Sequence, residues 1–293
     1  MNWRLLTLSI SLVFLFSCDS QRKKTIVSVP AFENDSISLR LKYAETSFVV
    51  PSPNQASLLL KKSNIQFYDD LATPSVTLEK FTTTTKKSLA LGIFGADLSY
   101  LNLFDQKEVA MKYLQNVQSL MSDLEIMPSI EKTTLKKIEN NFGNNDSVLY
   151  YLSELYKSSD LFLKANDRRD ICSLIVAGGW IESFYFLAEI YNRTHKDEIF
   201  TLILYQSDIL DNLIKLLSPF YERSTEFTVL IDDLVNIAYE FDVVDKVQLT
   251  TKVETDTEHQ FTKILNQARH LLTGSKLENL EKYATSLRNK ILK

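Results

Sequence analysis

Two carboxylates give the strongest indication of chemistry in this sequence. Glu182 lies in "IVAGGWIESFYFLAEI", and Asp97 has a similar apolar setting in "LGIFGAD". A carboxylate among such neighbours lies either on the wet edge of a helix or in the interior with a partner, because an unpaired buried charge is costly. Arg168 and Arg169 begin the same predicted helix as Glu182, so they are candidate partners in a structural ion pair. A functional polar pocket is the alternative, since perturbed carboxylates also mark active sites.

Glycines lie close to both carboxylates. Gly178 and Gly179 precede Trp180, and Gly92 and Gly95 lie on an earlier predicted helix. A glycine inside a helix costs about 0.5–1 kcal/mol relative to alanine, so these positions need compensation. We expect the two helices to cross closely at the glycines and to recover the cost through packing contacts.

The alternative is that the same stretches line a pocket. Its residues are the glycines, the tryptophan and the two carboxylates, namely Gly92, Gly95, Asp97, Gly178, Gly179, Trp180 and Glu182. The glycines match neither a G-x-G-x-x-G fingerprint nor a phosphate-binding loop, and no predicted strand precedes them. The helix contact is therefore the leading interpretation.

No other group of residues predicts a reaction. His259 and His270 are too far apart for an i,i+4 metal pair, "HExxH" is absent, and no serine lies in a G-x-S-x-G elbow. Cys172 lies in the apolar "DICSLIV", which favours a packed residue over a nucleophile. We therefore expect no catalytic residue, no metal and no cofactor, and a protein that is not an enzyme.

The N-terminus predicts export and a lipid anchor. Residues 1–17 have Arg4 followed by an apolar stretch of signal-peptide length. "LFSC" resembles a bacterial lipobox, with Phe16 larger than the usual residue, and this resemblance implies cleavage before Cys18 and its acylation. Each buried CH₂ contributes about 0.8 kcal/mol, so several acyl chains anchor firmly. An ordinary signal peptide with an incidental cysteine is the alternative.

Charge and cysteine content narrow the class of protein. The formal net charge is -4, and it becomes -5 once the signal peptide with Arg4 is removed. This acidic excess argues against nucleic acid binding, which needs concentrated positive charge. With Cys18 acylated, only Cys172 remains, so no disulfide forms within the chain and stability depends on a core.

Apolar residues at three- and four-residue steps predict an all-α, irregular multi-helix bundle of helical hairpins over residues 51–293. Residues 18–50 are expected to form a linker with a short helix near residues 38–46. Asp105 and Asp146 are the predicted N-caps of two helices, and residues 259–272 are predicted to be helical. One stripe is predicted to be buried, formed by Val109, Tyr113, Val117, Leu120 and Leu124.

Ser36 is a candidate site of modification. "DSI" at residues 35–37 resembles an Asp-Ser/Thr-apolar O-glycosylation signal of some diderm bacteria. The linker position would make its hydroxyl accessible.

Four stretches together resemble a family of uncharacterised, all-helical envelope lipoproteins of diderm bacteria. They are "PSPNQASLLLKKSNIQFYDD", "ALGIFGADLSYLNLFDQ", "NFGNNDSVLYYL" and "IVAGGWIESFYF". The resemblance implies a helical fold and an envelope location, and it implies no activity.

The leading hypothesis is therefore a non-enzymatic, lipid-anchored helical module that binds an envelope protein or supports an assembly, facing the periplasm. It attaches to a membrane through its N-terminal lipid, and the sequence leaves open which membrane. One alternative is a periplasmic small-molecule carrier or sensor with an aromatic pocket near Glu182 and Asp97. Another is an unrecognised hydrolase.

Overall fold

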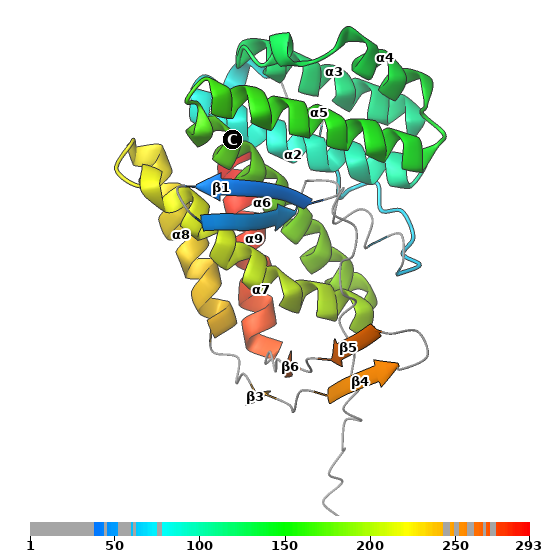
Figure 1. Cartoon of the computed structure of the whole chain (residues 1–293), viewed down its shortest axis with the longest axis vertical. Coiled ribbons are helices and arrows are strands. Elements are labelled where there is room, and N and C mark those ends of the chain that lie inside the picture. The colour runs from blue at the N-terminus through cyan, green and yellow to red at the C-terminus, as the bar shows by residue number, and fades with distance from the viewer. Residues whose placement is uncertain are drawn as a thin grey trace, which may run out of the picture.

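The helices form an irregular, all-α multi-helix bundle, which confirms the predicted fold class (Figure 1). The computed structural model describes residues 38–43, 46–51, 60, 63–74, 78–242, 247–248, 252–256, 261–265, 268–269 and 274–293. The α-helices are α2 (Thr84–Leu103), α3 (Lys107–Asp123), α4 (Lys132–Asn140), α5 (Asn145–Ala165), α6 (Arg169–Thr194), α7 (Asp197–Leu217), α8 (Thr225–Asp242) and α9 (Gly274–Leu292). Short 3-10 helices are η1 (Leu78–Lys80), η2 (Met127–Ser129) and η3 (Ser218–Phe220).

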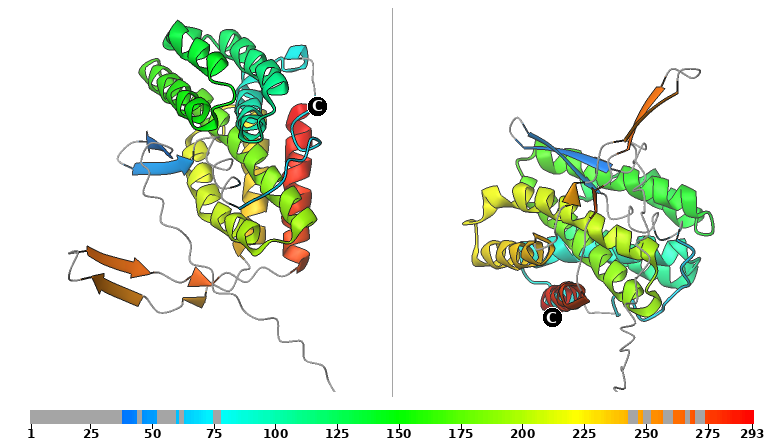
Figure 2. Two further views of the ribbon diagram at one scale, coloured as in Figure 1. Left: turned by 90° about the vertical axis from the view of Figure 1, so that its right-hand side faces the viewer. Right: turned by 90° about the horizontal axis from the view of Figure 1, so that it is seen from below.

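Helices α2 and α6 lie against each other at the centre of the bundle. Helices α3, α4 and α5 gather around α2 at one end, while α7, α8 and α9 surround the rest of α6 (Figures 1 and 2). With their caps, α2 (residues 83–104) and α6 (residues 168–195) therefore connect the two ends of the fold.

The two central helices are apolar on nearly every side. In α2, buried positions run without a gap from Ser88 to Leu103. Helix α6 is the one described helix that is long and apolar enough to cross a membrane, and its most apolar stretch is completely buried inside the protein. A helix that is apolar all round is buried either in a core or in a membrane, and here the neighbouring helices cover it.

Strands appear in two regions where the sequence did not predict them. Strands β1 (Ser38–Tyr43) and β2 (Thr46–Pro51) form an antiparallel pair, so the short helix expected near residues 38–46 is wrong. The alternation of apolar and basic residues in "LRLKY" has the period of a strand. Strand β2 runs beside α7.

The second region replaces the helix expected at residues 259–272. Strand β4 (Lys252–Asp256) pairs with β5 (Phe261–Leu265), and β3 (Val247–Gln248) pairs with β6 (Ala268–Arg269). In the β4–β5 register Val253 is paired with Ile264, and both are β-branched residues, which are enriched in strands. These short ladders lie outside the helical bundle (Figure 2).

Two predicted caps and one stripe residue also need correction. Asp105 has a left-handed φ of 58° and precedes the cap position of α3, while the side chain of Asn144, and not Asp146, caps α5 by accepting from the Ser147 amide. Val109 is 40% exposed, although the other four stripe residues are buried. Steps of four residues drift by about 40° each around a helix, which carries Val109 off the buried face.

Candidate functional site

The predicted glycines bring the backbones of α2 and α6 into direct contact. A Cβ atom on Gly92 would lie 2.0 Å from the Ile175 carbonyl oxygen and 2.5 Å from the Gly179 nitrogen. A Cβ atom on Gly178 would lie 2.0 Å from the Leu89 carbonyl oxygen. No side chain fits at either position, because the backbone atoms it would meet cannot turn away.

Gly95 makes a different contact from the one expected. A Cβ atom there would lie 1.6 Å from the hydroxyl oxygen of Tyr156, which comes from α5. Gly95 and Gly92 are three residues apart and point about 60° away from each other around α2. Gly95 therefore accommodates a side chain from α5 and does not contribute to the crossing with α6.

Glu182 lies one turn after Gly178 and forms a buried ion pair with Arg288 of α9. The Arg288 Nε donates to Glu182 Oε2 at 2.7 Å, and Arg288 Nη2 donates to Oε1 at 2.9 Å. The side chain of Glu182 is 0% exposed and that of Arg288 is 6% exposed. The Arg288 guanidinium also lies 4.2 Å from the ring centroid of Tyr185, so an aromatic face covers it.

Thr73 joins this ion pair to Asp97. The Thr73 hydroxyl donates to Glu182 Oε1 at 3.4 Å and accepts from Arg288 Nη2 at 3.1 Å, and the Thr73 amide donates to Asp97 Oδ1 at 3.0 Å. Asp97 is completely buried, and no described residue donates to its Oδ2. We call Asp97, Glu182, Arg288 and Thr73 the buried charge cluster.

Burial dominates the electrostatics of the cluster. Desolvation and then the charge of Glu182 raise the pKa of Asp97 well above its usual value. Desolvation also raises the pKa of Glu182, although the charge of Arg288 opposes it. Desolvation lowers the pKa of the Arg288 guanidinium, but the charge and hydrogen bonds of Glu182 and the charge of Asp97 together outweigh it and raise this pKa. Arg288 therefore stays charged, while the two carboxyl groups compete for this cation.

The sequence pointed to both carboxylates but not to their partner. Arg168 instead donates to the Leu124 carbonyl oxygen at 2.7 Å, and Arg169 is exposed. The signal for Arg288 is its place on the apolar stripe of α9, one residue after Leu287 and one turn after Ala284. A charged residue on a buried stripe requires a buried partner of opposite charge.

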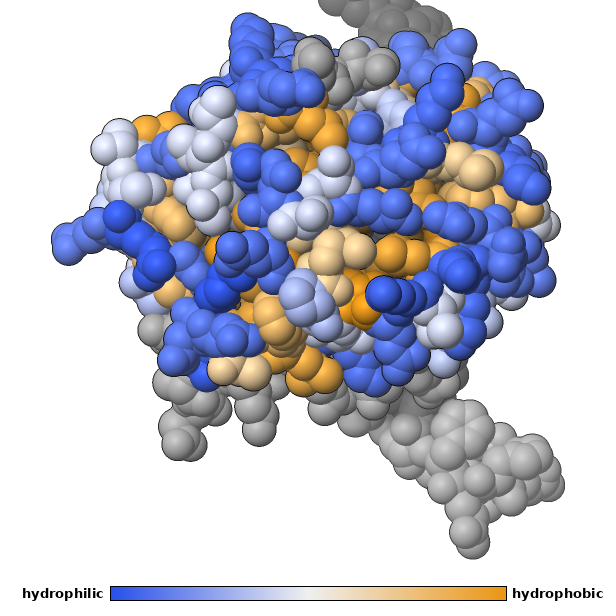
Figure 3. Space-filling model, turned by 90° about the horizontal axis from the view of Figure 1, so that it is seen from above, coloured by the Kyte–Doolittle hydropathy of each residue, from blue (hydrophilic) through white to orange (hydrophobic). Residues whose placement is uncertain are grey.

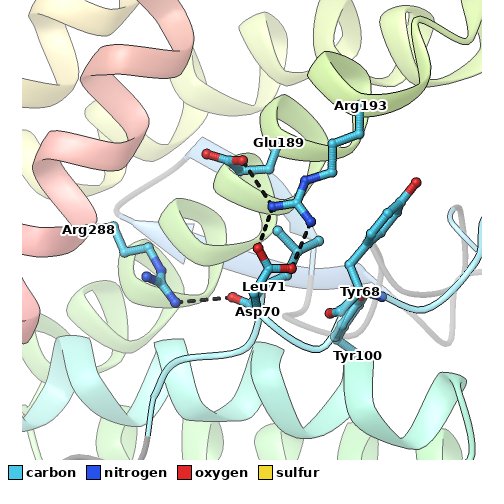
Figure 4. A network of polar contacts seen from close by, with 7 residues as sticks. All are labelled: Tyr68, Asp70, Leu71, Tyr100, Glu189, Arg193 and Arg288. Atoms are coloured by element: carbon cyan, nitrogen blue, oxygen red, sulfur yellow. Dashed lines mark hydrogen bonds and ion pairs between the residues drawn. The ribbon is translucent and has the colours of Figure 1, made fainter.

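A segment of irregular backbone closes the cluster. We call residues 63–74 the strap, because they cross the bundle and contact α2, α6 and α9 (Figure 4). Leu71, Ala72 and Thr73 of the strap are buried, and the Leu71 carbonyl oxygen accepts from Arg288 Nη2 at 3.2 Å. The hydroxyl of Tyr113 in α3 donates to the Thr73 carbonyl oxygen.

The outer part of the strap is held by side chains from α2 and α6. Arg193 binds Asp70 through two hydrogen bonds of 2.7 Å and lies 4.8 Å from the ring centroid of Tyr68 (Figure 4). The Tyr100 hydroxyl accepts from the Tyr68 amide at 3.0 Å and donates to its carbonyl oxygen at 3.1 Å. These contacts position the strap so that Thr73 reaches both carboxylates.

Trp180 is part of the core and does not join the cluster. It is 5% exposed and stacks on Phe184, with ring centroids 5.1 Å apart. Its Nε1 has no hydrogen-bond partner in the described part of the chain.

A small cavity lies elsewhere, between α2, α3, α5 and α6. Its volume is about 20 Å³, enough for one water molecule, and most of its lining is apolar. The Cys172 thiol beside it donates to Asp160 Oδ1 at 2.8 Å, and burial raises the pKa of this thiol. Cys172 is therefore held as a thiol, which is a poor nucleophile.

The remaining predicted sites lie outside the described residues or have no counterpart in them. Cys18 and Ser36 belong to the first group, as does the signal peptide. Within the described residues, no group of three His, Cys, Asp or Glu side chains is arranged to hold a metal ion.

No known protein family, curated protein or solved structure matches this chain. Its function must therefore be argued from its own residues.

Proposed function

We propose that this protein is a non-enzymatic, lipid-anchored helical module of the bacterial cell envelope that binds a protein partner and faces the periplasm. The anchor is Cys18, as inferred from the sequence. The protein would then consist, in chain order, of a lipid anchor, a linker and a helical body.

The buried charge cluster supports a module without catalysis. Both oxygens of Glu182 accept hydrogen bonds from Arg288, and the strap covers them. A general acid or base must reach a substrate atom within hydrogen-bonding distance. Glu182 is 0% exposed. Its role in this proposal is structural, because its ion pair with Arg288 holds α6 and α9 together.

The exposed apolar side chains of α5 carry the proposal of a protein partner. Tyr150 is 58% exposed and Leu161 is 61% exposed. They are eleven residues apart, about three helical turns, so they lie on one face of α5. At the end of the bundle formed by α3, α4 and α5, hydrophobic surface lies open between hydrophilic side chains (Figure 3). Aromatic side chains such as that of tyrosine are enriched at protein interfaces.

Affinity capture from the native envelope tests this function. The tagged, acylated chain is compared with a Tyr150→Ser/Leu161→Ser variant, and captured proteins are identified by mass spectrometry. We expect one partner that the parent retains and the variant loses. Tyr239→Ser is the matched control, because Tyr239 is 63% exposed on α8 and its loss leaves α5 unchanged.

Two outcomes contradict the proposal. One is a partner retained equally by the parent and the α5 variant. The other is a small molecule that co-purifies while no protein does.

A small-molecule carrier or sensor is the second candidate. The observation that favours it is Asp97 Oδ2, a buried polar atom to which no described residue donates. A ligand with a hydrogen-bond donor would satisfy this atom, but only after the strap moves away. Native mass spectrometry of the protein from its own envelope tests this candidate by detecting a bound small molecule.

A further inference from the structure

The carboxyl group of Asp97 has unequal partners at its two oxygens. Oδ1 accepts from the Thr73 amide at 3.0 Å, whereas no described residue donates to Oδ2. The residue is 0% exposed. An ionised carboxylate in this position would leave a charged acceptor without a donor, which is among the costliest arrangements in a protein interior.

The charges around Asp97 show the same imbalance. Two carboxyl groups share one cation, and the hydrogen bonds of Arg288 to carboxylate oxygens both go to Glu182. With Asp97 ionised the buried charge cluster has a net negative charge, and one proton makes it neutral. Thr73 donates to both carboxyl groups, and two carboxyl groups that share one site cannot easily both ionise.

Other titratable groups packed on this region do not supply the missing positive charge. Tyr113 faces the cluster from α3 and Tyr185 from α6, and burial raises the pKa of both phenols. Tyr156 of α5 lies against Gly95 on the same helix as Asp97, and burial raises its pKa as well. All three stay neutral.

We propose that Asp97 is a proton-binding site whose protonated Oδ2 donates to Glu182, and that this proton is required for the strap to close over the buried charge cluster. Protonation converts the acceptor that lacks a donor into a donor. It also leaves Glu182 as the single anion paired with Arg288. In agreement with this arrangement, Asp97 acts on Glu182 as a hydrogen-bond donor would and lowers its pKa.

The proposal predicts the direction of the pH dependence. With the strap closed, desolvation and the charge of Glu182 raise the pKa of Asp97 above the ordinary value of 3.8. An open strap would expose the carboxyl group to water and remove this desolvation, so its pKa would be lower. The closed state then binds the proton more tightly. Closure is favoured at low pH, and its equilibrium constant falls about tenfold per pH unit between the open-state and closed-state pKa values.

Hydrogen exchange of the Thr73 amide in the full chain measures strap closure directly. We expect the protection factor in the parent to fall with rising pH, by up to about tenfold per pH unit. In Asp97→Asn the amide side chain keeps the acceptor for Thr73 and supplies a donor to Glu182 without ionising. Its protection factor should be independent of pH and higher than that of the parent at pH 8.

Asp69→Asn is the matched control, because Asp69 is an exposed aspartate on the strap. It should keep the pH dependence of the parent. The proposal is wrong if Asp97→Asn retains that dependence, or if it folds but protects Thr73 less than the parent at every pH.

Infrared spectroscopy of the parent keeps the proposal testable even if the variant fails to fold. A carbonyl stretching band of a protonated carboxylic acid at pH 7 supports it. The absence of that band overturns it.

Discussion

The contact between α2 and α6 contains two regions that are stabilised in different ways. At the crossing, Gly92 and Gly178 allow backbone to touch backbone, and no charge is involved. One turn further along α6, Glu182 depends on Arg288 from α9 and on Thr73 from the strap. The crossing is determined by shape within one pair of helices. The buried charge cluster is determined by charge balance among segments that are far apart in the chain.

This difference explains why the two regions should respond differently to substitution. At a backbone contact, neighbouring atoms cannot move aside for a new side chain, because the atoms that it meets belong to the main chain. A buried ion pair can be replaced by apolar side chains of similar volume, often at little cost.

The largest effect is expected at the crossing, from Gly178→Leu. The first atom of the new side chain would already lie 2.0 Å from the Leu89 carbonyl oxygen, so the two helices must separate. We expect a loss of more than about 4 kcal/mol in the free energy of unfolding, or no folded protein. Urea denaturation followed by circular dichroism measures this loss. A variant as stable as the parent would refute the close crossing.

Gly95→Ala is the control for the same helix. Its Cβ meets the hydroxyl end of Tyr156, a side chain that can shift. We expect a smaller loss of about 1–3 kcal/mol, typical of overpacking. Tyr156→Phe should recover only part of it, because the ring carbon Cζ would still lie 2.9 Å from the new Cβ atom. If Gly95→Ala costs as much as Gly178→Leu, the distinction between backbone and side-chain contacts is wrong.

The next largest effect is expected in the buried charge cluster, from Arg288→Met. It leaves the buried carboxylate of Glu182 without its cation, which typically costs about 3–5 kcal/mol. Adding Glu182→Leu removes the unpaired charge, so the double variant should recover most of the loss. A double-mutant cycle from urea denaturation gives the coupling between the two positions.

Arg168→Met serves as the comparison, since Arg168 was the partner suggested by the sequence. It loses one hydrogen bond to the Leu124 carbonyl oxygen, which should cost about 1.5–3 kcal/mol. Two results would contradict the assigned ion pair. One is a larger loss of stability from Arg168→Met than from Arg288→Met, and the other is a double-mutant cycle that shows no coupling between Arg288 and Glu182.

The same contrast separates what the sequence predicted from what it did not. Helix periodicity predicts most of the helices, because each needs only local spacing of apolar residues. The glycine crossing could be anticipated because the cost of Gly92 and Gly178 inside helices signals close packing. The role of Gly95 could not, because it depends on Tyr156 from another helix.

The buried charge cluster could be predicted only in half. Apolar neighbours singled out Asp97 and Glu182 as carboxylates that lie either at the wet edge of a helix or in the interior with a partner. They did not identify Arg288, which is 106 residues from Glu182 in the chain. A single sequence contains no direct signal for such a pairing. The strands at residues 247–269 were missed for a related reason, since a strand is stable only with a partner and its local pattern is weak.

The smallest effect is expected at the outer edge of the strap, from Asp70→Asn. Asp70 and Asp97 both hold the strap, but their surroundings are opposite, because the Asp70 side chain is 62% exposed while Asp97 is buried. The hydrogen bonds of Arg193 lower the pKa of Asp70 below 3.8. This pair therefore stabilises the fold above that pH, and the contribution is lost as the pH falls through the lowered pKa.

Solvent screening limits the Asp70 contribution to about 0.2–1 kcal/mol, and added salt should reduce it. Urea denaturation at pH 3 to 6 should show a shallower acid loss in Asp70→Asn than in the parent, whereas Asp97→Asn should flatten the loss on the alkaline side. Two aspartates that hold one segment then have opposite pH signatures, because water reaches one and not the other. Two results would show that solvent exposure does not explain the difference between Asp70 and the buried charge cluster. One is a loss of stability in Asp70→Asn as large as that in Arg288→Met, and the other is an Asp70 contribution that does not change with salt.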